Sequence, residues 1–192
     1  MYGAAVFRGR SRTIHYFYLT YGELNVDTGL WSRDGVDPGA QLFAINSAYG
    51  SQQLQQGTIA HYDPLTDLCF VTLNFGDYAP DTRNGLFTFD PNTRTIGTVF
   101  ANGKLGVQTA SPSMVVVGRK LYFFTKQDNV YLGPCRMNTG IIVDMDTLAV
   151  QDFIVSGETT KSTFSTSSTG QETIPACFDG SNTIYRWNYD ST

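Results

Sequence analysis

The sequence predicts an all-β protein built from antiparallel four-stranded meanders. Short β-branched or aromatic runs with alternating polarity dominate the chain, which has thirteen Phe and eleven Tyr, and no window sustains apolar residues at helical spacing. Nineteen glycines separate most of these runs. Similar turns recur at intervals of some tens of residues, which is typical of a repeat architecture.

The first kind of turn contains aspartate between two apolar strands. It occurs in segments 23–31, 59–68, 86–96 and 141–150, around Asp27, Asp63, Asp90 and the pair Asp144 and Asp146. An Asp side chain accepts a hydrogen bond from the backbone two residues on, and a following Pro presets φ for the first central turn position. We therefore assign these carboxylates to turn formation, with Gly29 supplying a positive φ after Asp27.

The second kind of turn contains glycine and leads into a strand through Leu-Tyr or Ile-Tyr. It occurs in segments 114–124 and 176–185, with a looser copy in 6–18. Together the two kinds of turn predict meanders at about 4–32, 57–100 and 113–155, and a C-terminal hairpin at 174–189. The Gln- and Gly-rich stretch 47–57 and the Ser/Thr-rich stretch 157–173 are expected to be loops. The latter is either solvated or ordered against a partner. We expect one β-repeat domain over 1–192.

Two segments resemble known repeats. Segment 84–99 (NGLFTFDPNTRTIGTV) resembles the strand, Asp-Pro-x-Thr turn and strand of β-propeller repeats of the YVTN and kelch-like kinds, and segment 178–185 (FDGSNTIY) is similar to the inner hairpin of such blades. The resemblance implies a β-propeller or part of one. The turn aspartates are unevenly spaced, by 36, 27 and 54 positions, so a β-sandwich is the alternative.

Composition excludes several classes of protein. Charged residues make up 16% of the chain and the net charge is −4, which is no electrostatic footprint for nucleic acid. Cys69, Cys135 and Cys177 are odd in number and far apart, so neither a disulfide framework nor a zinc site is indicated. Charges lie where a Sec signal peptide would need its apolar core, and we expect no membrane span.

No catalytic, cofactor or metal site is predicted. The sequence has no phosphate-binding glycine loop, zinc-protease motif or nucleophile elbow. We assign His15 and His61 to packing or surface positions, and Asp144 and Asp146 to a turn rather than to calcium, which needs six to eight oxygen ligands. Glu23, Glu158 and Glu172 are the only glutamates, and two of them lie in the Ser/Thr-rich stretch, a poor place for a preorganised acid.

Two sets of residues are candidates for partner contacts. Arg8, Arg10 and Arg12 point to one face if they lie on an extended strand, and so form a basic stripe. Such a stripe either blocks strand addition or meets an acidic subunit or a nucleic-acid backbone. Trp31 and Trp187 either fill a sheet or, with Tyr189, stack on sugar rings.

These observations favour a non-enzymatic structural or binding module that is a subunit of a larger assembly. Few charges, abundant Thr and aromatic residues and the lack of a catalytic set are similar in style to phage virion components such as tail, nozzle or fibre proteins. The expected location is a virion or the extracellular space, and the expected partners are other protein subunits, including copies of the same chain. The alternative is a secreted or cell-surface propeller that binds or cleaves carbohydrate.

Overall fold

The computed structural model describes residues 4–17, 21–32, 59–74, 84–100, 113–124, 139–154 and 176–186. Within these ranges every regular element is a β-strand and every strand pairing is antiparallel, so the all-β prediction is confirmed. The predicted loops 47–57 and 157–173, Cys135, Trp187, Tyr189, Glu158 and Glu172 lie outside the described residues.

The strands form three four-stranded sheets and one two-stranded sheet, each in chain order. Sheet 1 contains β1 (Ala4–Arg8), β2 (Thr13–Phe17), β3 (Tyr21–Asn25) and β4 (Trp31–Ser32). Sheet 2 contains β5 (Ala60–Asp63), β6 (Leu68–Asn74), β7 (Asn84–Asp90) and β8 (Thr95–Phe100). Sheet 3 contains β9 (Ser113–Val117), β10 (Lys120–Phe124), β11 (Thr139–Asp144) and β12 (Val150–Ile154), and sheet 4 contains β13 (Ala176–Phe178) and β14 (Ile184–Arg186). The meanders therefore lie where the turns predicted them.

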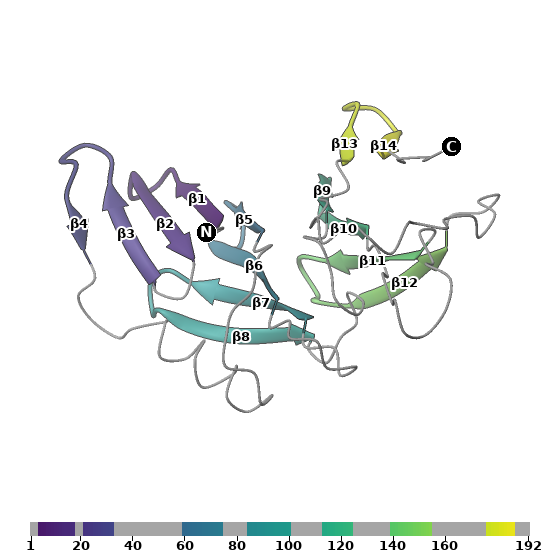
Figure 1. Ribbon diagram of the computed structural model, residues 1–192, viewed down its shortest axis with the longest axis horizontal. Helices are drawn as coiled ribbons and strands as arrows, with labels where there is room; N and C mark the ends of the chain where they lie inside the picture. Colours follow the sequence, from purple (N-terminus) through teal and green to yellow (C-terminus); the bar gives the residue numbers. More distant parts are fainter. Residues whose placement is uncertain are drawn as a thin grey trace, which may run out of the picture.

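The sheets follow one another along an arc, with sheet 1 at one end and sheet 4 at the other (Figure 1). The first strands of sheets 1 and 2 are neighbours, because β1 contacts β5. The first strands of sheets 3 and 4 are also neighbours, because β9 contacts β13.

Sheet 2 is covered on both faces. Successive side chains along each of its strands point to opposite faces. One face packs against sheet 1 and the other against sheet 3, in two separate hydrophobic clusters. The first cluster comprises Val6, Phe17, Tyr21, Cys69, Val71, Phe87 and Phe89. The second comprises Phe70, Leu86, Phe100, Leu121, Phe123, Ile141, Val143 and Met145. Burial on both faces explains why both alternating sets of β6 and β7 positions contain large apolar side chains, such as Phe70 and Val71 in β6 and Leu86 and Phe87 in β7.

Side-chain caps fix three of the predicted aspartate turns. The carboxylates of Asp63, Asp90 and Asp144 each accept hydrogen bonds from the backbone N–H groups two and three residues on. A Thr occupies the third position, and the fourth position is left-handed: φ is 59° at Asp67, 57° at Arg94 and 59° at Leu148. The predicted turn role of these three carboxylates is confirmed.

The assignments of Asp27 and Asp146 to turn formation were wrong. In the first turn Asn25 is the cap, since its side-chain oxygen accepts from the N–H groups of Asp27 and Thr28, and Gly29 takes the left-handed position with φ 68°. Asp27 and Asp146 instead receive arginine side chains, Arg12 and Arg119 respectively. Each lies two residues after its cap, to which it donates its backbone N–H.

Candidate functional site

The turns between first and second strands are joined to the turns between third and fourth strands by a contact that repeats in all three large sheets. The residue directly before the second strand is Arg12 in sheet 1, Asp67 in sheet 2 and Arg119 in sheet 3. In sheets 1 and 3 the arginine binds a carboxylate of the turn between the third and fourth strands, which we call the outer turn, at 2.6 Å. The backbone carbonyl of the arginine accepts a backbone N–H from the same turn. In sheet 2 the amide of Asn92 donates to Asp67 at 3.0 Å. One local geometry is therefore built three times with different charges.

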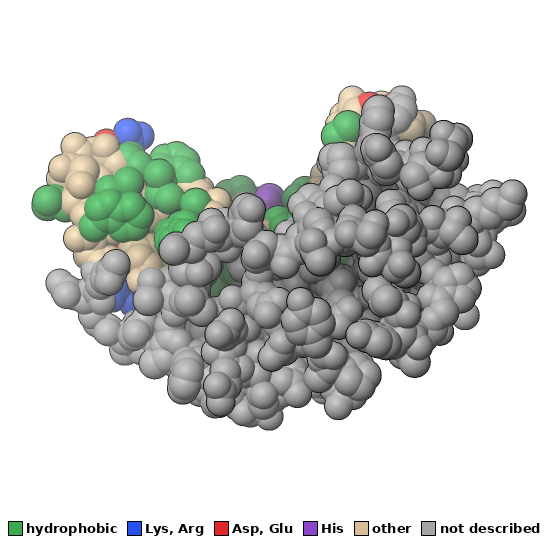
Figure 2. All heavy atoms as spheres, viewed as in Figure 1, with side chains coloured by type: hydrophobic (Ala, Val, Ile, Leu, Met, Phe, Trp, Pro, Cys, Tyr) green, Lys and Arg blue, Asp and Glu red, His purple; other side chains and the backbone are tan. Residues whose placement is uncertain are grey.

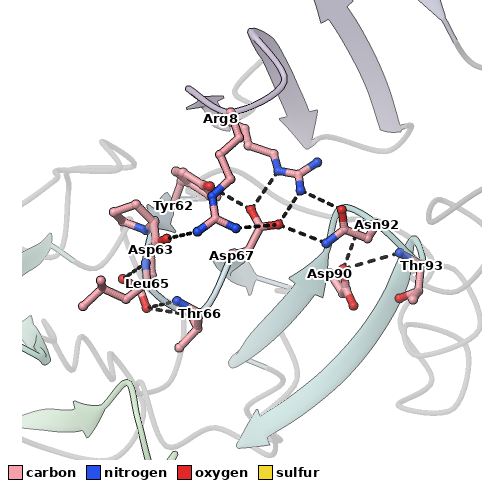
Figure 3. A network of polar contacts seen from close by, with 11 residues as sticks. Arg8, Tyr62, Asp63, Leu65, Thr66, Asp67, Asp90, Asn92 and Thr93 are labelled. Carbon is pink, nitrogen blue, oxygen red and sulfur yellow. Dashed lines mark hydrogen bonds and ion pairs between the residues drawn. The ribbon is translucent and has the colours of Figure 1, made fainter.

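Arg8 and Asp67 join sheet 1 to sheet 2. The guanidinium of Arg8, at the end of β1, forms a two-pronged pair with the carboxylate of Asp67 and donates to the Asn92 side-chain oxygen at 2.7 Å. The hydroxyl of Tyr62 also donates to Asp67, at 2.7 Å, and the carboxylate lies at the centre of these donors (Figure 3). The side chains of Arg8 and Asp67 are only 12% and 13% exposed. The hydrogen bonds from Arg8 hold the pKa of Asp67 well below its usual range.

Arg119 joins sheet 3 to sheet 2 in the same way. It precedes β10 and donates to both carboxylate oxygens of Asp63, at 2.6 and 2.8 Å, while it also binds Asp146. Asp63 is buried, and the hydrogen bonds from Arg119 lower its pKa far below the ordinary value. The turn between β5 and β6 thus offers one carboxylate to each neighbouring sheet.

The predicted basic stripe is not present. Only Arg8 lies on a strand, because β1 ends there and residues 9–12 form the turn, with Arg12 at φ 51°. Arg8 points between sheets 1 and 2, Arg10 reaches the Pro64 carbonyl at 3.0 Å, and Arg12 pairs with Asp27. Arg10 and Arg12 do not share the strand face of Arg8, because β1 ends at Arg8 and the turn begins at Gly9.

His15 lies at the contact between sheets 1 and 2. Its Nδ1 is 2.6 Å from the hydroxyl of Tyr21, which donates its only proton to Glu23, and Arg94 donates to the same carboxylate at 3.0 Å. Nδ1 must therefore carry the proton, leaving Nε2 as an acceptor with no partner in the described part of the chain. Burial lowers the pKa of His15 to about 4. At 2% exposure this imidazole is closed to a substrate, so it is part of the core.

Within the described strands, the face of sheet 1 that points away from sheet 2 has no charged side chain and is apolar apart from the hydroxyl of Tyr16. Register places Phe7 opposite Ile14, Ile14 opposite Leu24, and Leu24 opposite Trp31. This set, completed by Ala5, Tyr16 and Gly22, we call the outward face: Ala5, Phe7, Ile14, Tyr16, Gly22, Leu24 and Trp31. Hydrophobic side chains gather at the sheet 1 end of the molecule, beside a hollow between the two ends of the arc (Figure 2). No described sheet covers this face.

Trp31 is the most prominent side chain of the outward face. It is 60% exposed and Phe7 is 50% exposed, although both are large and hydrophobic. The indole ring lies over Gly22, where an added Cβ would come within 3.2 Å of it. An aromatic ring seated on a glycine of the neighbouring strand is held in position, so Trp31 is a preorganised contact.

The candidate site is therefore the outward face of sheet 1. In the ranges that the structure describes, no group of three metal-ligating side chains occurs, and no helix is long and apolar enough to span a bilayer. Trp31 was predicted from the sequence, but its neighbours Phe7 and Ile14 were not, although apolar side chains on both alternating sets of β1, with Val6 on one and Phe7 on the other, were the signal for a sheet with two apolar faces. Comparison with protein families and with curated proteins finds no match.

Proposed function

We propose that this protein is a non-enzymatic structural subunit that joins a larger assembly through the outward face of sheet 1. The observation that carries the proposal is the in-register stripe of Phe7, Ile14, Leu24 and Trp31 across four strands. A free antiparallel sheet normally keeps one polar face toward water. An exposed apolar face rimmed by charged residues marks a protein contact, and Arg12 and Asp27 provide such a rim here.

The serial stacking of the sheets supports the arrangement of β-propeller blades. A sandwich consists of two sheets, whereas here sheet 2 lies between sheets 1 and 3. The first strands of sheets 1 and 2 are neighbours, and so are those of sheets 3 and 4. A phage virion component, such as a tail, nozzle or fibre protein, is the assembly that the composition favours, with few charged residues and many Thr and aromatic residues.

Sedimentation of the purified chain tests the proposal. We expect the wild type to associate, and the double variant Phe7→Lys with Trp31→Lys to be monomeric, because two charges on the outward face would be buried in the contact. Leu65→Lys is the matched control, since Leu65 is an exposed apolar residue in the β5–β6 turn, away from this face. A wild type that stays monomeric would contradict the proposal.

Glycan binding is the second candidate function, and the exposure of Trp31 is the observation that favours it. Exposed aromatic rings stack on sugars, but they usually do so beside convergent polar groups, and the neighbours of Trp31 on its own face are apolar. A monomer whose binding to a glycan array is lost in Trp31→Lys would replace the assembly function with this one.

A further inference from the structure

The charged contacts between consecutive sheets follow a positional rule. Where sheet 1 meets sheet 2 and where sheet 2 meets sheet 3, the residue directly before the second strand of the later sheet pairs with an oppositely charged residue at the end of the first strand of the earlier one; the same positions between sheets 3 and 4, Val117 and Thr183, are uncharged. Asp67 of sheet 2 pairs with Arg8 of sheet 1, and Arg119 of sheet 3 pairs with Asp63 of sheet 2. The sign of the pair is reversed between the two contacts, but the positions are the same.

Arg12 occupies this position in sheet 1. It binds Asp27 of its own outer turn as Arg119 binds Asp146, and its carbonyl accepts the backbone N–H of Val26 at 3.0 Å as that of Arg119 accepts Met145 at 2.9 Å. Arg119 also pairs with Asp63 of the preceding sheet and is 29% exposed. The Arg12 side chain, which has no preceding sheet beside it among the described residues, is 59% exposed. By the same geometry, the outward face fits a sheet whose first strand ends in an acid.

Sheet 4 has such an acid. Asp179 directly follows β13, and its backbone N–H continues the ladder by donating to the Thr183 carbonyl at 3.1 Å. Its carboxylate accepts the N–H groups of Ser181 and Asn182, as that of Asp63 accepts those two and three residues on. Asp179 is therefore the counterpart of Asp63, and it is exposed.

We propose that a second copy of this chain covers the outward face of sheet 1 with its sheet 4, and that two copies close head to tail through two Arg12–Asp179 pairs. This inference rests on the proposed function and names the partner. Sheets 1 and 4 lie at opposite ends of the open arc (Figure 1). A two-fold rotation about an axis through its open side carries sheet 4 of one copy to sheet 1 of the other. The two contacts are then identical and the assembly is closed.

Charge reversal tests the pairing in a way that separates this inference from the proposed function. We expect wild type to sediment with the mass of two 21.2 kDa chains. Arg12→Asp alone and Asp179→Arg alone each place like charges at both contacts, so each should weaken dimerisation by about a hundredfold. An equimolar mixture of the two variants restores opposite charges at both contacts and should dimerise again.

Folding of the variants is checked separately. Asp is among the residues tolerated at the left-handed φ of Arg12. Asp179→Asn keeps the side-chain cap of its turn while removing the charge, so it should weaken dimerisation by about tenfold without change in the circular dichroism spectrum. One result would separate the two proposals: Phe7→Lys with Trp31→Lys abolishes dimerisation, but Arg12→Asp, Asp179→Arg and Asp179→Asn do not weaken it. The Arg12–Asp179 contact would then be wrong and the proposed function would stand. A monomeric wild type contradicts both.

Discussion

The two faces of sheet 1 both carry large apolar side chains, but they have different surroundings. Val6 and Phe17 point inward and are buried against sheet 2, whereas Phe7, the neighbour of Val6 on the same strand, is half exposed. The inner face is closed at its rim by the part-buried pair of Arg8 and Asp67, and the outward face ends in the exposed pair of Arg12 and Asp27. Sheet 2 shows what such two-sided apolarity means, because both of its faces are covered. Sheet 1 therefore has the side chains of a sheet that a partner covers.

The largest expected difference between the faces comes from removing an aromatic ring. Phe17→Ala should destabilise the fold by about 4 kcal/mol, because Phe17 is buried and its ring packs edge-on against Phe89 at 5.3 Å. Phe7→Ala should lower the stability of the monomer by less than about 1 kcal/mol, since surface substitutions rarely do more. Urea denaturation at low protein concentration measures both. Equal losses would mean that the outward face is covered within one chain.

The next expected difference concerns the two arginines at the ends of the β1–β2 turn. Arg8→Met leaves the part-buried carboxylate of Asp67 without its two-pronged partner, and should destabilise the protein by about 3 kcal/mol. Arg12→Met removes an exposed pair and should change monomer stability by less than about 1 kcal/mol. Thermal unfolding of the two variants in parallel provides the comparison, and a small effect of Arg8→Met would remove the rim pair from the account of sheet packing.

The inner face should also make stability depend on pH through His15. Burial lowers the folded-state pKa to about 4 from an ordinary 6.5, despite the opposing charge of Glu23, so the unfolded chain binds a proton first as pH falls. Stability is therefore fully present above pH 6.5 and decreases toward pH 4, with a loss of about 2 kcal/mol at about pH 5. The His61 pKa is lowered too, and acts in the same direction.

A His15→Gln variant isolates this contribution, because it keeps His61 and the groups that face His15, namely Arg8, Glu23, Asp67 and Arg94. Its free energy of unfolding should fall less steeply than that of wild type between pH 6.5 and 4. The aspartates at the rim have far lower pKa values and lose their contribution only under more acidic conditions. Parallel pH profiles for the two proteins would show that His15 is not buried as a neutral imidazole.

The sequence predicted the strands and most of the turns, because these depend on local chemistry. Alternation placed the meanders, and Asp followed by Pro placed the caps at Asp63 and Asp90. The cap at Asn25 was missed because Asn25 and Asp27 both have short polar side chains. The threonine three residues after each cap, Thr28 in this turn, would have distinguished them.

The site was harder to predict, because its contacts join distant parts of the chain. Arg8 and Asp67 are 59 positions apart, and although Gly9 marks the end of the strand, nothing near Arg8 indicates that its side chain lies between two sheets. Trp31 was singled out as a possible contact, but its role as sheet filling or as a surface depends on whether another sheet lies beyond it. Only the order in which the sheets stack answers that question.

The mass of the purified chain in solution, determined by sedimentation equilibrium, tests the central claim most directly. We expect a mass above that of one 21.2 kDa chain for wild type and for Leu65→Lys, and the monomer mass for the variant with Phe7→Lys and Trp31→Lys. A monomeric wild type, or an oligomer that persists when both outward-face residues are lysine, would contradict it.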